Sequence, residues 1–191
     1  MKIEYEATFL DVDKSEIREK LKKVGAVLIR SEYLQKRIPF DLPKGKRSKG
    51  KWLRVRDEGN QITLSLKEVD GERIESQKEI CLVVNNFEDA VNILKLIGCE
   101  PKSYQENKRE FWKLDNVEIT IDTWPFLEPF VEVEGQSEEE VKKVSEKIGF
   151  DYSKALFCST TTIYKMKYNI SDDKVNSIKK IVFDMENPFI E

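Results

Sequence analysis

The chain has 191 residues, a length typical of one domain with a sizeable core, and 36% of them are charged although the net charge is only −3. This balance argues against a nucleic-acid-binding surface or an acidic tail. The chain contains no histidine, which excludes histidine bases and metal ligands. A bound metal would therefore be held by oxygen atoms, as Mg²⁺, Mn²⁺ and Ca²⁺ prefer.

Cysteine usage and hydropathy indicate the compartment. Cys81, Cys99 and Cys158 are odd in number and lack the spacing of a zinc site, so we expect reduced thiols. The N-terminus has no apolar signal core, and no apolar run approaches the roughly 20 residues that span a bilayer. We expect a soluble, cytoplasmic protein without a membrane partner.

The first third of the chain predicts two strands around a helix. Apolar and polar residues alternate over residues 3–10, which is typical of a strand. The following helix would begin at a capping box, Asp13-Lys14-Ser15-Glu16, and would end at Gly25. A second strand is expected over residues 28–40, and an exposed basic loop over residues 44–51.

Two hairpins follow in the sequence. The first joins residues 52–56 to 61–67 around Glu58-Gly59-Asn60, with a further strand at 79–84. The second joins residues 109–113 to 117–123 around Asp115-Asn116, with a further strand at 130–134.

A strand that carries carboxylates, followed by a helix that ends in glycine, occurs three times. The carboxylate motifs of these strands are Glu4-Tyr5-Glu6, a degraded copy around Glu79, and Glu132-Val133-Glu134. Asn86 and Ser137 would cap the second and third helices. These helices are expected to end at Gly98 and Gly149, as the first does at Gly25.

About eight strands, mostly in antiparallel hairpins with helices between them, predict an α+β fold. Strand side chains alternate between two faces, so one face of this sheet is apolar and the other is charged. If the sheet closes with helices on its apolar outside, the charges line a polar interior. We expect one domain over residues 1–168, and a tail over residues 169–191 that packs on the domain or on a partner subunit.

Candidate site residues lie on the charged face. Carboxylates could hold Mg²⁺ while cations bind phosphate oxygens, so both sets together suit a polyphosphate ligand. Each motif alone is more typical of a solvated strand face, and a purely structural α+β protein is the alternative. The carboxylates are Glu4, Glu6, Glu79, Asp122, Glu132 and Glu134, and the cations are Arg54, Arg56, Lys67 and Arg109.

Six short motifs, in this order over most of the chain, resemble the CYTH superfamily, the triphosphate tunnel metalloenzymes. The resemblance runs from Lys2 to about Tyr164, and the superfamily includes class IV adenylate cyclases and thiamine triphosphatases. The motifs are Glu4-Tyr5-Glu6, Leu53-Arg54-Val55-Arg56, Thr63-Leu64-Ser65-Leu66-Lys67, Lys108-Arg109, Ile119-Thr120-Ile121-Asp122 and Phe130-Val131-Glu132-Val133-Glu134-Gly135.

This resemblance implies an antiparallel eight-stranded β-barrel, a triphosphate tunnel with helices packed outside. ATP, thiamine triphosphate or tripolyphosphate would be the substrate, with Mg²⁺ or Mn²⁺ as cofactor. From the balanced charge we expect no nucleic-acid partner, and we expect a monomer or homodimer. The implied catalytic residues are Glu4, Glu6, Arg54, Arg56, Lys67 and Arg109. Substrate would bind Arg54, Arg56, Lys67, Arg109 and Lys36, and metal would bind Glu4, Glu6, Asp122, Glu132, Glu134 and Glu79.

Two positions depart from the family pattern. Thr8 occupies a lysine position of the first strand, and Cys81 stands where relatives often carry a second carboxylate. Lys36 or Arg37 could supply the missing charge. Three hypotheses stay open: a cyclase that converts ATP to cyclic AMP and pyrophosphate, a triphosphate hydrolase, and a non-catalytic nucleotide- or polyphosphate-binding protein that has lost turnover.

Overall fold

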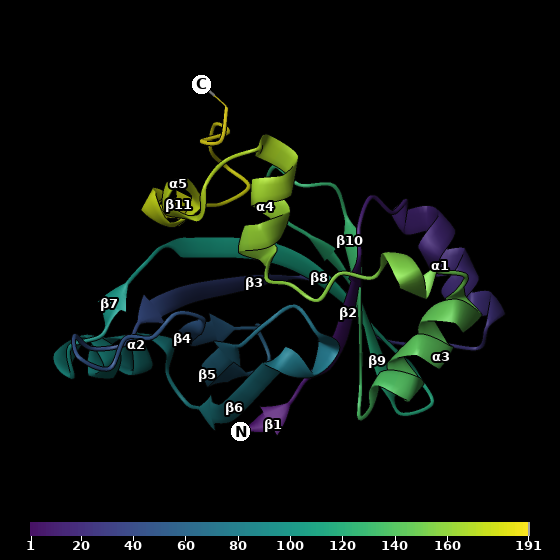
Figure 1. The fold of residues 1–191 in the computed structure, drawn as a ribbon, viewed down its shortest axis with the longest axis horizontal. Coiled ribbons are helices and arrows are strands. Elements are labelled where there is room, and N and C mark those ends of the chain that lie inside the picture. Colours follow the sequence, from purple (N-terminus) through teal and green to yellow (C-terminus); the bar gives the residue numbers. More distant parts are fainter. Residues whose placement is uncertain (191) are drawn as a thin grey trace.

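The computed structural model describes residues 1–190 and contains one sheet that curls into a nearly closed barrel (Figure 1). Its hydrogen-bonded order is β1-β6-β5-β4-β3-β8-β9-β10-β2, and all neighbours in this order are antiparallel. The strands are β1 (Lys2–Ile3), β2 (Tyr5–Phe9), β3 (Val27–Asp41), β4 (Lys51–Asp57), β5 (Ile62–Val69), β6 (Gln77–Val84), β8 (Tyr104–Leu114), β9 (Val117–Thr123) and β10 (Phe130–Gly135).

The N-terminal strand brings the two edges of the sheet together. Only Glu4 separates β1 from β2, yet β1 pairs with β6 and β2 pairs with β10. The Glu4 backbone N–H also donates to the Gln77 carbonyl at 2.9 Å. Counted as one strand, β1 and β2 give the expected antiparallel eight-stranded barrel within residues 1–190. Two short strands are additional: β7 (Glu100–Pro101) on β3, and β11 (Lys180–Ile181), which runs parallel to β8.

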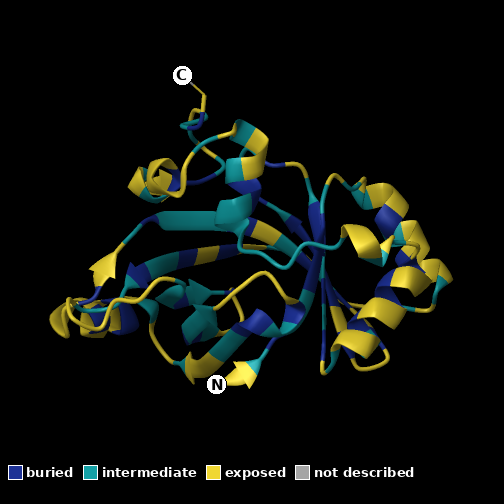
Figure 2. Cartoon of the chain, in the orientation of Figure 1, coloured by how far each residue is buried: buried dark blue, intermediate teal, exposed yellow. Residues whose placement is uncertain are grey.

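The apolar face of the sheet points outward, and three helices cover most of it, as predicted, while Ile80 and Leu82 of β6 are exposed. Helices α1 (Lys14–Lys23) and α3 (Glu138–Ile148) cover β2, β9 and β10, while α2 (Phe87–Leu96) covers β4 (Figure 1). Leu21 and Val141 are fully buried against Ile119 and Val133 of the sheet. In Figure 2 the exposed residues of α1 and α3 lie away from the strands that they cover. The main core therefore lies outside the barrel, which leaves the interior free for polar side chains.

The helices begin at the capping residues that the sequence predicts. The Asp13 carboxylate accepts from the backbone N–H groups of Ser15 and Glu16, and the Asn86 and Ser137 side chains accept from the third residue of their helices. Gly149 follows α3 with φ +100°, a conformation that favours glycine. Among residues 1–190, no helix has both the length and the apolar character needed to cross a membrane.

The C-terminal segment lies against the barrel. It consists of η2 (Tyr152–Lys154), α4 (Thr160–Tyr168), α5 (Asp172–Ser177) and β11. Leu156 exchanges two backbone hydrogen bonds with Thr8, on the edge of β2. Further along, the Phe189 ring stacks on Tyr164 with ring centroids 4.3 Å apart. Residues 169–190 thereby join a second apolar cluster, which includes Trp124 and Phe130.

Gly50, just before β4, allows the close approach of two backbone segments. Its φ is +79°, and an added Cβ would lie 2.1 Å from the Val69 carbonyl oxygen. Gly45, in the same loop, has φ +85° but has nothing within 4 Å of such a Cβ.

Replacing either glycine by alanine tests this difference. Both variants should lose roughly 1 kcal/mol because alanine disfavours a positive φ. Gly50→Ala should lose about 1–3 kcal/mol more, since its methyl group cannot be accommodated without moving the strand. Urea denaturation measures both, and equal losses would contradict the close approach at Gly50.

Candidate functional site

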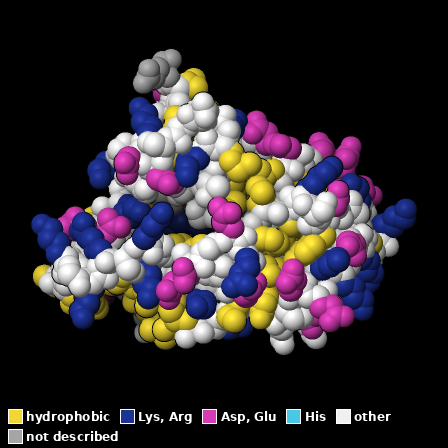
Figure 3. Space-filling model, viewed as in Figure 1, with side chains coloured by type: hydrophobic (Ala, Val, Ile, Leu, Met, Phe, Trp, Pro, Cys, Tyr) yellow, Lys and Arg dark blue, Asp and Glu magenta, His cyan; other side chains and the backbone are white. Residues whose placement is uncertain are grey.

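The barrel interior contains a cavity of about 750 Å³ lined by the inward-facing residues of the strands. It lies between the C-terminal helices and the strands opposite them, where Figure 3 shows a hollow with Lys and Arg side chains at its rim. Nine expected site residues line it, and they come from β2, β4, β5, β6, β8, β10 and the β1–β2 junction. They are Glu4, Glu6, Arg54, Arg56, Lys67, Glu79, Arg109, Glu132 and Glu134.

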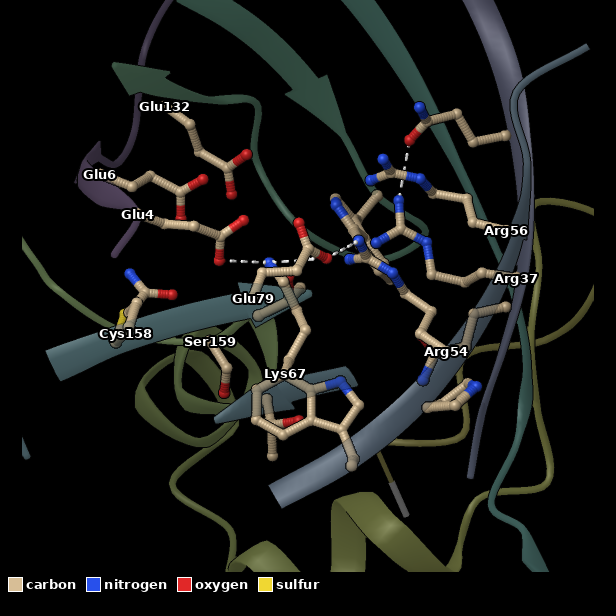
Figure 4. Close-up of a pocket in the computed structure, with 18 of the residues that line it drawn as sticks. Glu4, Glu6, Arg37, Arg54, Arg56, Lys67, Glu79, Glu132, Cys158 and Ser159 are labelled. Atoms are coloured by element: carbon tan, nitrogen blue, oxygen red, sulfur yellow. Dashed lines mark hydrogen bonds and ion pairs between the residues drawn. The ribbon is translucent and has the colours of Figure 1, made fainter. Parts of the chain in front are cut away.

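The charges in this cavity are segregated (Figure 4). Glu4, Glu6 and Glu132 lie together on one side, and Arg37, Arg54 and Arg56 lie on the other, with Lys67 and Glu79 between them. Strand order explains this separation. Neighbouring strands β2 and β10 carry the carboxylates, and neighbouring strands β3 and β4 carry the guanidinium groups.

The carboxylates on β2 and β10 repel one another. Glu6 lies opposite Glu134 in the strand register, and Glu132 is two register pairs away on the same face of the sheet. Burial, reinforced by these two neighbours, raises the pKa of Glu6 well above its usual range. Within residues 1–190, Glu6 and Glu134 have no ion-pair partner, whereas the carboxylate of Glu4 accepts from Lys67 at 2.9 Å. This side of the cavity therefore holds more carboxyl groups than its own cations pair with, and burial favours the protonated form of Glu6 in the absence of a bound cation.

Lys67 and Glu79 connect the two sides. The Lys67 Nζ lies 2.9 Å from Glu4 and 3.9 Å from Glu79, and Arg54 donates to Glu79 at 3.1 Å. Burial acts to raise the pKa of Glu79, but Lys67 and Arg54 outweigh it and lower this pKa to about 2. Burial instead raises the pKa of Glu4 to about 7, against the opposing effect of Lys67.

Arg109 is held in place by Asp122. Its Nε and Nη2 atoms donate to the two oxygens of Asp122 at 3.0 and 2.7 Å, and Nη2 also donates to Glu132 at 2.6 Å. Asp122 accepts further bonds from Asn107 and Thr120, both at 2.8 Å. These four bonds use the four lone-pair directions of a fully buried carboxylate. Asp122 is absent from the cavity lining, so it positions Arg109 and has no free oxygen to offer an expected metal ion.

Lys36 also differs from its expected position. It is exposed and does not line the cavity, while Gln35 and Arg37 on either side of it are buried and do. Of the two cations considered for the charge missing at Thr8, Arg37 is therefore the one that faces the interior. Thr8 itself is buried, and Cys81 is exposed; neither lines the cavity.

Several lining residues were not expected from the sequence. Gln35 lies two residues before Arg37 on β3, so both side chains point to the same face of the sheet. Once Arg37 is placed in the interior, this alternation identifies Gln35 as a lining residue. Trp124 and residues 158–161 follow no such pattern, because a tertiary contact places them. The bridge between Thr8 and Leu156 brings residues 158–161 over the cavity.

The donor atoms suit a divalent metal that binds together with phosphate. No three Asp, Glu or Cys side chains within residues 1–190 converge closely enough to form a complete metal cage. Mg²⁺ commonly uses only one or two carboxylates and takes its other ligands from water and substrate phosphates. Glu6, Glu132 and Glu134 offer oxygen donors of this kind, and two of them lack a cationic partner.

The chain belongs to the CYTH family, because the sequence model of the CYTH domain matches residues 2–166. A protein of Methanocaldococcus jannaschii named "Putative adenylate cyclase" is 28% identical over 160 residues, which cover 82% of this chain and 90% of that protein.

Solved structures show the same fold. One of Vibrio parahaemolyticus, named as a "putative adenylate cyclase", has a TM-score of 0.72 at 14% identity and covers 85% of this chain and 97% of its own. The PH1819 protein of Pyrococcus horikoshii has a TM-score of 0.68 at 19% identity, with 86% and 99% covered. A protein of Hippeastrum named "Putative adenylyl cyclase" has a TM-score of 0.57 at 16% identity, with 87% of this chain and 96% of its own covered.

Replacing Asp122 by asparagine tests its role in holding Arg109. The amide has nearly the same shape, but its NH₂ group would face neighbours that all donate, so Arg109 loses its main charge partner. We expect a loss of about 3 kcal/mol, typical of a broken buried ion pair. Thr120→Val removes only one of the four bonds and should cost about 1 kcal/mol. Chemical denaturation gives both values, and a neutral Asp122→Asn change would contradict this role.

Proposed function

We propose that this protein is a divalent-metal-dependent enzyme that acts on a triphosphate held inside the barrel, and that hydrolysis is its main reaction. The separation of Glu4, Glu6 and Glu132 from Arg37, Arg54 and Arg56 across one cavity carries this proposal. A polyphosphate anion matches the guanidinium side, and a metal ion bound to the same anion matches the carboxylate side.

The cations have distinct tasks in this proposal. Arg54 and Arg56 would bind phosphate oxygens through paired N–H groups, Arg109 would use its remaining Nη1 group, and Lys67 would contribute a point charge between the two sides. Arg109 is already fixed by Asp122, so it reaches the substrate without the entropy cost of ordering a long side chain. Together these groups would stabilise the negative charge that develops on the phosphoryl oxygens.

Glu6, Glu132 and Glu134 would hold the metal, with Glu4 and Glu79 beside them. When bound, Mg²⁺ or Mn²⁺ would neutralise phosphate charge and orient the phosphoryl group for in-line attack. The carboxylates themselves would accept hydrogen bonds from the attacking water and fix its direction.

Hydrolysis and cyclisation would use the same charges, and the orientation of the triphosphate decides between them. The Hippeastrum relative is described as an adenylyl cyclase homologue with a dominant triphosphatase activity, which supports hydrolysis as the main reaction here. The names of the Methanocaldococcus and Vibrio relatives support cyclase activity as the alternative. A non-catalytic triphosphate-binding protein is the remaining alternative, suggested by Thr8 and Cys81.

A phosphorus NMR time course with Mg²⁺ tests the proposal on tripolyphosphate and on ATP. Orthophosphate released from tripolyphosphate is the expected product. Cyclic AMP with pyrophosphate from ATP would identify a cyclase instead, and broadened ligand signals without product would identify a binding protein. Unchanged spectra for both ligands would exclude the triphosphate site.

Glu6→Gln and Glu134→Gln test the carboxylate side in the same assay. Neither residue has an ion-pair partner in the part of the chain that the structure describes, so the fold should keep its stability. We expect the rate to fall at least about tenfold, equivalent to about 1.4 kcal/mol in the barrier. Glu139→Gln, which removes an exposed carboxylate from α3, is the matched control. Full activity in both cavity variants would argue against a carboxylate-bound metal.

A further inference from the structure

Arg37 differs from Arg54, Arg56, Lys67 and Arg109, the four cations predicted from the sequence that line the cavity. It lies on the inner face of β3 and is only 7% exposed. No carboxylate within residues 1–190 lies within the 4.0 Å that defines an ion pair with it. Those four cations all have carboxylate partners: Arg54 with Glu79, Arg56 with Glu58, Lys67 with Glu4, and Arg109 with Asp122 and Glu132.

Neutral groups hold the Arg37 side chain in one position. Its Nη2 atom donates to Oε1 of Gln35 at 2.8 Å and to Oδ1 of Asn107. The guanidinium carbon lies 4.6 Å from the centre of the Trp124 ring. The acceptors are amides, so they orient the guanidinium group without neutralising it. Its Nε atom is buried and has no hydrogen-bond partner.

This arrangement is unfavourable in the absence of an anion. A buried charge without a partner loses its hydration and receives no compensating attraction. Other cations surround it: burial first, and then Arg54, Arg56 and Arg109, lower the pKa of Arg37 well below its usual range. A packing role would be served better by an uncharged side chain, so the retained charge indicates a ligand.

We propose that Arg37 is a substrate-binding residue whose counter-ion is the triphosphate itself. It lies beside Arg54 and Arg56, opposite the carboxylates, so it contacts the part of the polyphosphate that is farther from the metal (Figure 4). Gln35, Asn107 and Trp124 fix its orientation before substrate arrives, which reduces the ordering cost on binding. This inference rests on the proposed triphosphate site.

Two substitutions test the inference from opposite directions. Arg37→Gln removes the charge but keeps a side chain that can donate to the amides. Gln35→Glu keeps Arg37 and gives it a carboxylate partner of nearly the same shape, 2.8 Å away. Both variants should bind tripolyphosphate about 10- to 100-fold more weakly than the wild type. Arg37→Gln removes the guanidinium group that contacts phosphate, and in Gln35→Glu that group is already paired with a carboxylate.

In the absence of ligand, both variants should be at least as stable as the wild type. Each change relieves an uncompensated buried charge, so both variants should unfold at a temperature equal to the wild type or about 2–4 °C higher. Titration calorimetry with tripolyphosphate, in the cold with Mg²⁺ and again in EDTA, measures affinity, and thermal unfolding without ligand measures stability.

Each outcome bears on the inference. Weaker binding without loss of stability in Gln35→Glu supports it, even if Arg37→Gln fails to fold. Wild-type affinity in either folded variant overturns it and leaves the triphosphate site intact. Weaker binding together with an equal loss of stability in both variants also overturns it, because Arg37 would then be structural. A wild-type protein that binds no tripolyphosphate would overturn the proposed function and this inference together.

Discussion

Closing the sheet with its charged face inward forces like charges from neighbouring strands into one enclosed space. The closure depends on the first ten residues, because β1 pairs with β6 while β2 pairs with β10. It places Glu6 beside Glu132 and Glu134 without a cationic partner in the described chain. Such repulsion opposes folding, and the helix-covered apolar face outside the barrel must offset it.

The charged groups form a graded series from fully paired to unpaired. Arg109 is fixed by Asp122, and Lys67 is shared between Glu4 and Glu79, whereas Arg37 has only neutral partners. Paired groups keep the walls of the cavity rigid, and unpaired groups leave carboxyl oxygens and guanidinium N–H groups available to a ligand. A polyphosphate would pair with the unpaired guanidinium group, and its metal ion would pair with the unpaired carboxyl groups. Binding would thus compensate the stability that both sides of the cavity lose in the free protein.

Local chemistry in the sequence predicts most of this architecture. Alternation identifies the strands, and the side chains of Asp13, Asn86 and Ser137 identify the helix starts. The choice between Lys36 and Arg37 could not be made in this way. The β3–β8 register shifts between Leu28 and Tyr33, so alternation counted from the start of β3 does not fix which residues face inward. The role of Asp122 depends on four hydrogen bonds from three residues of β8 and β9, and the position of residues 158–161 depends on a tertiary bridge.

A crystal structure with Mn²⁺ and tripolyphosphate tests the central claim most directly, since anomalous scattering locates manganese independently of the phosphates. The charge separation predicts manganese beside Glu6, Glu132 and Glu134, with the phosphate chain extending inside the barrel towards Arg54 and Arg37. Manganese outside the barrel, or phosphates bound only at the surface, would contradict this account of the cavity.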